Sequence, residues 1–252
     1  MNGDGACPSE VMARLAAIYG SAGPGLALLT QIDPGFTASF TAYAEAAYRG
    51  ASLDPRLRQL LLLAHDVSIT NLDGTGARNR VLLALQAGAT EREVTTVIEL
   101  VTMVSLHGLT RGFPLLCTLE EQVSDADAPT GGYWAAFETA FPAFHRRMKA
   151  ANPDAFAAYR AMGEHIWTTG GLDPAWAELV FVVIDLANTH LFTEGAAFHI
   201  RNALHYGATH QQVLDAVFLT VPSIVRSLEV GLSAVAEATA LFEQENKAGR
   251  TG

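Results

Sequence analysis

GGLDPAWAELVFVVIDLA at residues 170–187 and AFHIRNALHYGATHQQV at 197–213 decide the fold, because both stretches also occur earlier in altered form. The earlier versions are GASLDPRLRQLLLLAHDVS at 50–68 and ARNRVLLALQAGATEREV at 77–94. The LDP motif (53 to 172) and the GAT motif (88 to 207) both recur at an offset of 119 residues. This recurrence indicates a tandem duplication of a unit of about 120 residues, a length typical of one domain.

The predicted organisation is therefore two units and a linker. We expect the first unit to span residues 1–120 and the second to span 133–252. Residues 121–132, EQVSDADAPTGG, are acidic, contain Pro and Gly and are poor in apolar side chains, which is typical of a linker. Positions at which the two units agree are expected to be scaffold, and positions at which their polar residues differ are expected to carry chemistry.

Helix signals occur throughout both units. In each LDP motif the Asp fits a helix N-cap and the Pro fits the first helical position, where a missing N–H costs nothing. Gly88 and Gly207 fit the left-handed residue that follows a helix end. No stretch of any length alternates with a period of two residues, so we predict an all-α fold.

The composition excludes several function classes. The chain has 252 residues, of which 50% are hydrophobic, and a formal net charge of −10. An acidic chain without a run of Lys or Arg argues against nucleic acid and anionic membrane surfaces as partners. The longest apolar runs are too short to span a bilayer. Two distant cysteines make a disulfide framework improbable and favour a cytoplasmic location.

The sequence carries an ordered set of features: an LDP cap, an apolar helix, a short loop and the motif H-x-R-x-A-L-x-x-G-A-T. In this set the chain resembles the carboxymuconolactone decarboxylase family, which includes alkylhydroperoxidase-D-like proteins. The second unit carries the resemblance best, through His199, Arg201 and the segment 203–209. The first unit has Arg80 at the position that matches His199. The resemblance implies an all-α fold and homo-oligomers. A tandem chain would then form a trimer that resembles a hexamer.

The cysteine positions indicate the branch of the family. Peroxidase-like members carry C-x-x-C ahead of the histidine, and those positions here are Phe192 and Gly195. Because peroxide reduction needs a thiolate and a resolving thiol, we exclude that chemistry at this site. The resemblance then implies the decarboxylase branch, which works by acid–base chemistry with no organic cofactor and no metal. In that branch an acid commonly lies four residues before the histidine, where this chain has Gly195.

Three residues are predicted to be catalytic. His199 can act as general acid or base near neutral pH. Glu194, at the start of the same predicted helix, or Asp185, inside an apolar helix, would orient or polarise it. Asp185 matches Asp66, so a structural hydrogen bond common to both units is the alternative for this residue.

Three further residues are predicted to bind substrate. His190 precedes the His199 helix and would line the mouth of the pocket, and Trp167 lies beside the second LDP motif. Arg80 could hold a carboxylate, unless the first unit has a degenerate pocket. The H-x3-E-x4-H string formed by His190, Glu194 and His199 does not place its side chains on one helix face, so we expect no metal site there. His107 is expected in the core.

The predicted function is a cofactor-independent, decarboxylase-like lyase that acts on a small unsaturated lactone or carboxylic acid. Loss of CO₂ from such a substrate leaves electrons that a conjugated carbonyl accepts, and the enzyme must stabilise that oxygen and reprotonate carbon. The same groups could serve an isomerase or a lactone-opening tailoring enzyme. A small-molecule-binding or scaffold protein without catalysis is the alternative from a different class.

Overall fold

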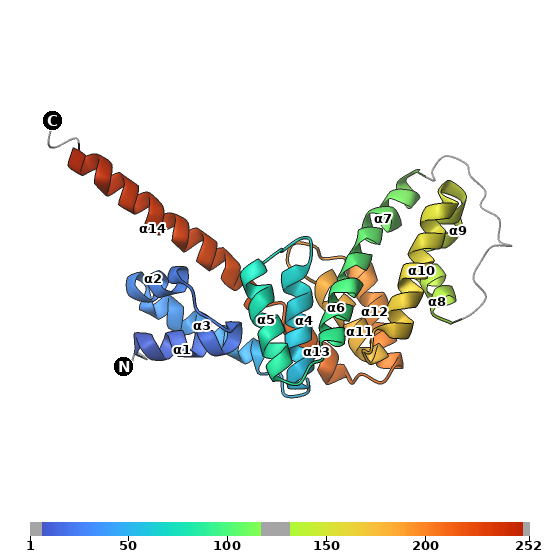
Figure 1. The fold of residues 1–252 in the computed structure, drawn as a ribbon, viewed down its shortest axis with the longest axis horizontal. Coiled ribbons are helices and arrows are strands. Elements are labelled where there is room, and N and C mark those ends of the chain that lie inside the picture. Colours follow the sequence, from blue (N-terminus) through green and yellow to red (C-terminus); the bar gives the residue numbers. More distant parts are fainter. Residues whose placement is uncertain (1–6, 117–131, 249–252) are drawn as a thin grey trace.

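The computed structural model describes residues 7–116 and 132–248, which fold into helices with no strand (Figure 1). The prediction of an all-α fold is confirmed. The helices are α1 Pro8–Tyr19, α2 Pro24–Ile32, α3 Pro34–Tyr48, α4 Pro55–Val67, α5 Gly74–Gln86, α6 Glu91–Thr102, α7 His107–Leu116, α8 Gly132–Ala140, α9 Phe144–Ala151, α10 Pro153–Thr169, α11 Pro174–Asp185, α12 Thr193–His205, α13 His210–Phe218 and α14 Val225–Ala248, with short 3₁₀ turns η1 Met103–Leu106 and η3 Pro222–Ile224.

The predicted caps are present in both halves. The side chain of Asp54 accepts a hydrogen bond from the backbone of Arg56, and Asp173 accepts one from Ala175, so α4 and α11 start at the proline of each LDP motif. Gly88 and Gly207 have φ of 93° and 102°, the left-handed region that glycine adopts without strain. The two halves therefore use the same local chemistry to start and stop equivalent helices.

The centre of the molecule is the pair α4 and α11, which pack against each other. α5 lies against α4 and α12 lies against α11, while α6 contacts both central helices. The central helices are buried on nearly every side, which explains why their sequences, LLLLA at 60–64 and LVFVVI at 179–184, are apolar without a polar stripe. One continuous core cluster joins residues from both halves of the chain.

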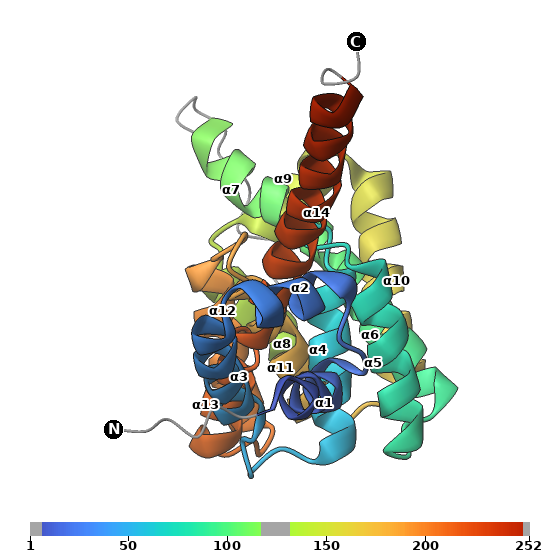
Figure 2. The same ribbon diagram turned by 90° about the vertical axis from the view of Figure 1, so that its left-hand side faces the viewer.

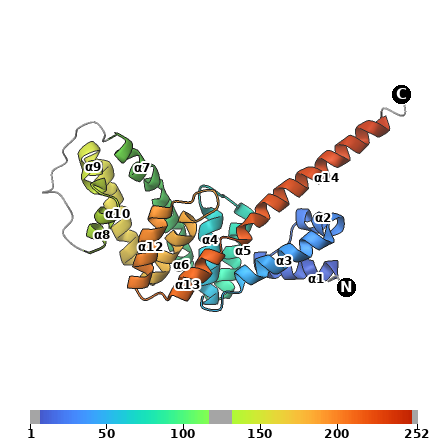
Figure 3. The ribbon, with the colours of Figure 1, turned by 180° about the vertical axis from the view of Figure 1, so that it is seen from behind.

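Two smaller bodies flank this centre at opposite ends of the long axis (Figure 1). Helices α1–α3 form one, with a core of their own beneath the start of α14. Helices α8–α10, with α7, form the other, around a cluster of aromatic rings. The first part of α14 packs against α2, and its far end projects away from the rest of the chain, as the views from the side and from behind show (Figures 2 and 3).

The predicted linker, 121–132, lies outside the described residues except for its last position, Gly132, which begins α8. Within the described parts of the chain, none of the helices combines the length and apolar character needed to cross a bilayer.

Candidate active site

The centre of the site is a buried pair of side chains from α11 and α12. His199 Nδ1 lies 2.6 Å from Glu178 Oε2, and the Glu178 side chain is fully buried. Asn202, one turn further along α12, donates a hydrogen bond of 3.3 Å to the other oxygen of Glu178. The Phe181 ring stacks on the imidazole, with ring centroids 4.4 Å apart. Glu178 and Phe181 thus fix the orientation of the imidazole, and the bond at Nδ1 leaves Nε2 to face a reactant.

His199 lines a cavity whose walls are mainly aromatic. The cavity volume is about 40 Å³, room for a few water molecules, whereas pockets for organic ligands are about 300–1,000 Å³. A lactone-sized substrate therefore requires the walls to move. α8 and α10 supply Tyr133, Trp134, Phe137, Tyr159 and Trp167; α11 and the α12 N-cap supply Phe181 and Phe192; and η1 and α7 supply Leu106, His107 and Thr110.

Asp185, the last residue of α11, is fully buried close to this cavity. Neither of its carboxylate oxygens has a hydrogen-bond partner among the described residues. α12 passes so close that a methyl group on Gly195 would overlap Asp185 Oδ2. Burial raises the pKa of Asp185 to about 7, although the nearby His199 acts in the opposite direction. Asp185, predicted from the sequence as a catalytic acid, thus lies in the site region but forms no hydrogen bond with His199.

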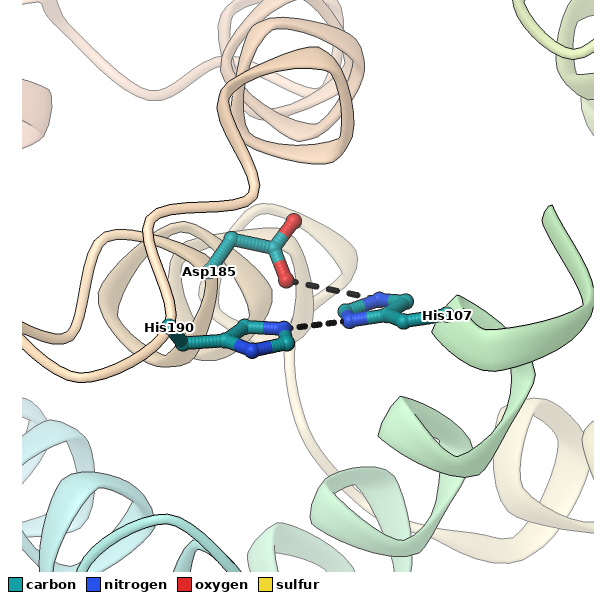
Figure 4. Close-up of side chains that lie close together, drawn as sticks. All are labelled: His107, Asp185 and His190. Atoms are coloured by element: carbon teal, nitrogen blue, oxygen red, sulfur yellow. Dashed lines mark hydrogen bonds and ion pairs between the residues drawn. The ribbon is translucent and has the colours of Figure 1, made fainter. Parts of the chain in front are cut away.

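His190 meets a residue that the sequence analysis had assigned to the core. His190 Nε2 lies 2.6 Å from His107 Nδ1, and the two rings stack with centroids 4.8 Å apart. The other nitrogen of His107 lies 3.5 Å from Asp185 Oδ1, so the three side chains form a chain from the interior to the loop before α12 (Figure 4). Burial lowers the pKa of His107 to about 3 and also lowers the pKa of His190.

Glu194 is placed away from His199. It lies in the first turn of α12, half-exposed, and forms an ion pair with Arg111 from α7. The hydrogen bond from Arg111 lowers the pKa of this carboxyl group. Glu194 therefore links α12 to α7, whereas Glu178 forms the bond with His199.

Arg80 does not line the His199 cavity. Its buried guanidinium, on α5, donates to the backbone oxygen of Ile18 and to Gln59 Oε1 at 3.3 Å, and it lies 3.6 Å from Asp66 Oδ2. It lines a separate cavity of about 560 Å³ between the first half of the chain and the start of α14, and Asp66 also lines this cavity. Trp167, in contrast, lines the His199 cavity, and its ring lies 5.8 Å from that of Tyr133.

Comparison with known proteins assigns the fold to a family. The carboxymuconolactone decarboxylase family model matches residues 153–243, which include α10 to α13 and therefore the His199–Glu178 pair. The second half of the chain therefore matches the carboxymuconolactone decarboxylase family, and the family resemblance seen in the sequence is confirmed. A crystal structure from Burkholderia xenovorans, provisionally assigned as a gamma-carboxymuconolactone decarboxylase subunit, is 29% identical. It superimposes with a TM-score of 0.81 over 94% of this chain and 98% of its own. No curated protein matches the chain.

Within the chain, the offset of 119 residues pairs most site residues with a counterpart of different chemistry. Glu178 corresponds to Gln59 and His199 to Arg80, while Asp185 keeps its carboxylate as Asp66. The remaining pairs are His190 with Asn71 and His107 with Arg226. The cavity in the second half thus holds acid–base groups at positions where the first half holds an amide or a guanidinium.

The sequence analysis missed two residues of this site, Glu178 and His107. Glu178 could have been found from the sequence, because it is an acid in an otherwise apolar helix and its counterpart is the uncharged Gln59. His107 had no such signal. It lies in the first half of the chain and reaches the second-half site only because α7 crosses over to pack beside α9.

Proposed function

We propose that the chain is a lyase of the decarboxylase type that acts by acid–base chemistry on a small unsaturated lactone or carboxylic acid. The observation that carries the proposal is the buried Glu178–His199 pair at the wall of an aromatic cavity. A histidine held at one nitrogen by a carboxylate is the arrangement that a general acid or base requires, because the carboxylate fixes the tautomer and stabilises the protonated ring.

The proposed reaction uses the cavity in two ways. The C–CO₂ bond breaks, and its electron pair moves into the conjugated carbonyl to give a dienolate. The apolar aromatic wall disfavours the localised charge of the substrate carboxylate more than the dispersed charge of the dienolate, which assists loss of CO₂. His199 Nε2–H then returns a proton to carbon, and Glu178 stabilises the imidazolium before that transfer.

CO₂ release and loss of ultraviolet absorbance with γ-carboxymuconolactone test this proposal. We expect turnover by the native chain and a decrease of about 10²–10⁴-fold in His199→Ala, the range for loss of a general acid–base group. His205→Ala is the matched control, since His205 is exposed on the same helix, and it should keep native turnover. Equal turnover in native protein and His199→Ala would contradict the assignment.

The same groups would serve an isomerase or a lactone-opening enzyme, because His199 could move protons on any small acid that fits the cavity. Product analysis by nuclear magnetic resonance distinguishes these reactions, since only decarboxylation releases one carbon. Saturable binding of the lactone without turnover would instead support the small-molecule-binding alternative.

We also propose that the chain forms a homo-oligomer through α14. Four apolar side chains of this helix are about half-exposed or more, with Phe242 65% exposed: Val230, Val235, Leu241 and Phe242. Apolar side chains that gather on one helix typically mark an interface between proteins. Light scattering coupled to size exclusion should give a mass of several chains, a trimer on the sequence analysis, and Leu241→Lys with Phe242→Lys should reduce it.

A further inference from the structure

Outside the Glu178–His199 pair, three possible metal ligands converge from three separate parts of the chain. His107 begins α7, Asp185 ends α11 and His190 lies in the loop between α11 and α12. One ligand atom from each lies within 4.8 Å of the other two (Figure 4). Two imidazoles and a carboxylate are a ligand set for divalent transition metals such as Zn²⁺, Co²⁺ or Fe²⁺.

The environment of Asp185 favours a bound cation. Its side chain is fully buried, and among the described residues neither oxygen accepts a hydrogen bond. A buried carboxylate is costly unless it is paired or coordinates a metal. His107 Nε2 lies 3.5 Å from Asp185 Oδ1, and the neighbouring Arg111 is already paired with Glu194.

The first half of the chain shows how the same position is neutralised by the protein itself. Asp66, the counterpart of Asp185, lies 3.6 Å from the Arg80 guanidinium. In the second half the residue that matches Arg80 is His199, which is bonded to Glu178 instead. Asp185 therefore keeps the carboxylate of the matched pair but has lost its fixed cation.

The distances allow one ion with a small adjustment. Ligand atoms at about 2.0–2.1 Å from a tetrahedral ion lie about 3.3 Å from each other, close to the 3.5 Å between His107 Nε2 and Asp185 Oδ1. His190 makes its short bond to the other nitrogen of His107, so its ring must turn toward Asp185 to complete the site. Its position in a loop, with part of the side chain exposed, permits that turn.

We propose that His107, Asp185 and His190 bind one divalent transition-metal cation per chain, with an open coordination position at the wall of the His199 cavity. His107 itself lines that cavity, so the ion would lie beside bound substrate. The site goes beyond the proposed acid–base function and departs from the metal-free chemistry that the family resemblance implies. The matched site around Asp66 has Asn71 and Arg226 at the positions of the two histidines, so it binds no second ion.

Binding of Co²⁺ and Zn²⁺ to chelator-treated, full-length protein tests this site without any use of turnover. We expect calorimetry to give one ion per chain, and Co²⁺ to give the visible absorption of a site with nitrogen and oxygen ligands. Asp185→Asn and His190→Ala should each weaken binding by at least about 100-fold, since each removes a direct ligand. His210→Ala, on the exposed start of α13, is the control and should bind as the native chain does.

Thermal unfolding gives a second measurement of metal binding, which also shows whether each variant is folded. Zn²⁺ should raise the Tm of the native chain and leave that of Asp185→Asn unchanged, because only an ion bound to the folded state stabilises it. Folded native protein that binds no ion, or an Asp185→Asn variant that binds as tightly as native protein, would overturn the proposal. Absence of turnover in the lactone assay would not contradict the metal site. Absence of metal binding would likewise not contradict the proposed lyase activity.

Discussion

At position 199 a histidine forms a 2.6 Å bond with the carboxylate of Glu178, whereas at the matched position 80 an arginine forms a 3.3 Å bond with the amide of Gln59. Both pairs join equivalent helices, α11 to α12 and α4 to α5, and both lie beside a buried aspartate. An imidazole can act as a general acid or base, whereas a guanidinium keeps its charge. Equivalent helices therefore hold a carboxylate–imidazole pair in one half and a fixed charge in the other.

The difference also shows how each half balances its buried charge. Arg80 is neutralised by Asp66 at 3.6 Å and held by a backbone oxygen, although its Nε has no hydrogen-bond partner among the described residues. In the second half His199 is engaged by Glu178, and Asp185 remains without a hydrogen bond among the described residues. We infer that the first half serves as scaffold and that the second half carries the chemistry.

The largest expected effect on stability comes from removing the ion pair between Arg80 and Asp66. Arg80→Met should lower the free energy of unfolding by about 3–5 kcal/mol, because it leaves the buried carboxylate of Asp66 without its cation. Asp185→Asn, measured in a chelator, should leave stability unchanged or raise it, because it removes a buried carboxylate that accepts no hydrogen bond among the described residues. Urea unfolding measures both, and similar losses in the two variants would contradict the comparison.

A smaller effect is expected in the pH dependence of stability. It concerns the aromatic cluster of α7–α10, which borders the His199 cavity and not the Arg80 cavity. Burial lowers the pKa of His145, next to Trp134 and Tyr159, to about 4 from an ordinary value of 6.5. The unfolded chain therefore takes up a proton that the folded chain does not, and stability is lost as the pH falls from 6.5 through about 4.

His145→Gln removes this titration, so its unfolding free energy should fall less over that pH range than that of the native chain. Tryptophan fluorescence during urea unfolding, at several pH values, measures it. His210→Gln should keep the native pH dependence, and an unchanged dependence in His145→Gln would show that His145 is not the group that titrates.

The smallest effects are expected at the helix caps, where the two halves agree. Thr90 and Thr209 each form a capping box, with Glu93 and Gln212 respectively. Thr90→Ala and Thr209→Ala should each cost about 1 kcal/mol, the usual value for loss of an N-cap side chain. Thermal unfolding should give equal changes within error, and a large difference would mean that this part of the scaffold is not equivalent in the two halves.

Much of the fold could be predicted from the sequence, because it depends on local signals. The LDP and GAT motifs predict the starts and ends of the central helices by capping chemistry that acts within a few residues. Their positions at Pro55, Pro174, Gly88 and Gly207 are confirmed.

The site was only partly predictable, because it depends on which helix faces meet. His199 does line the cavity, but a sequence does not show that Glu178, 21 residues earlier, points to the same place while the adjacent Glu194 points to Arg111. His107 could not be placed, since it reaches the site from the other half of the chain. Polar residues that differ between the matched positions of the two halves do mark the site. The difference between Gln59 and Glu178 identifies the partner of His199.

The most direct test of a single acid–base site in the second half is turnover by two reciprocal variants. Glu178→Gln should lower CO₂ release from γ-carboxymuconolactone by about 10²-fold or more, because the amide cannot stabilise a protonated His199. Gln59→Glu makes the opposite change in the first half and should leave turnover within about twofold of native in folded protein. Native turnover in Glu178→Gln, or an equal loss in both variants, would contradict the account.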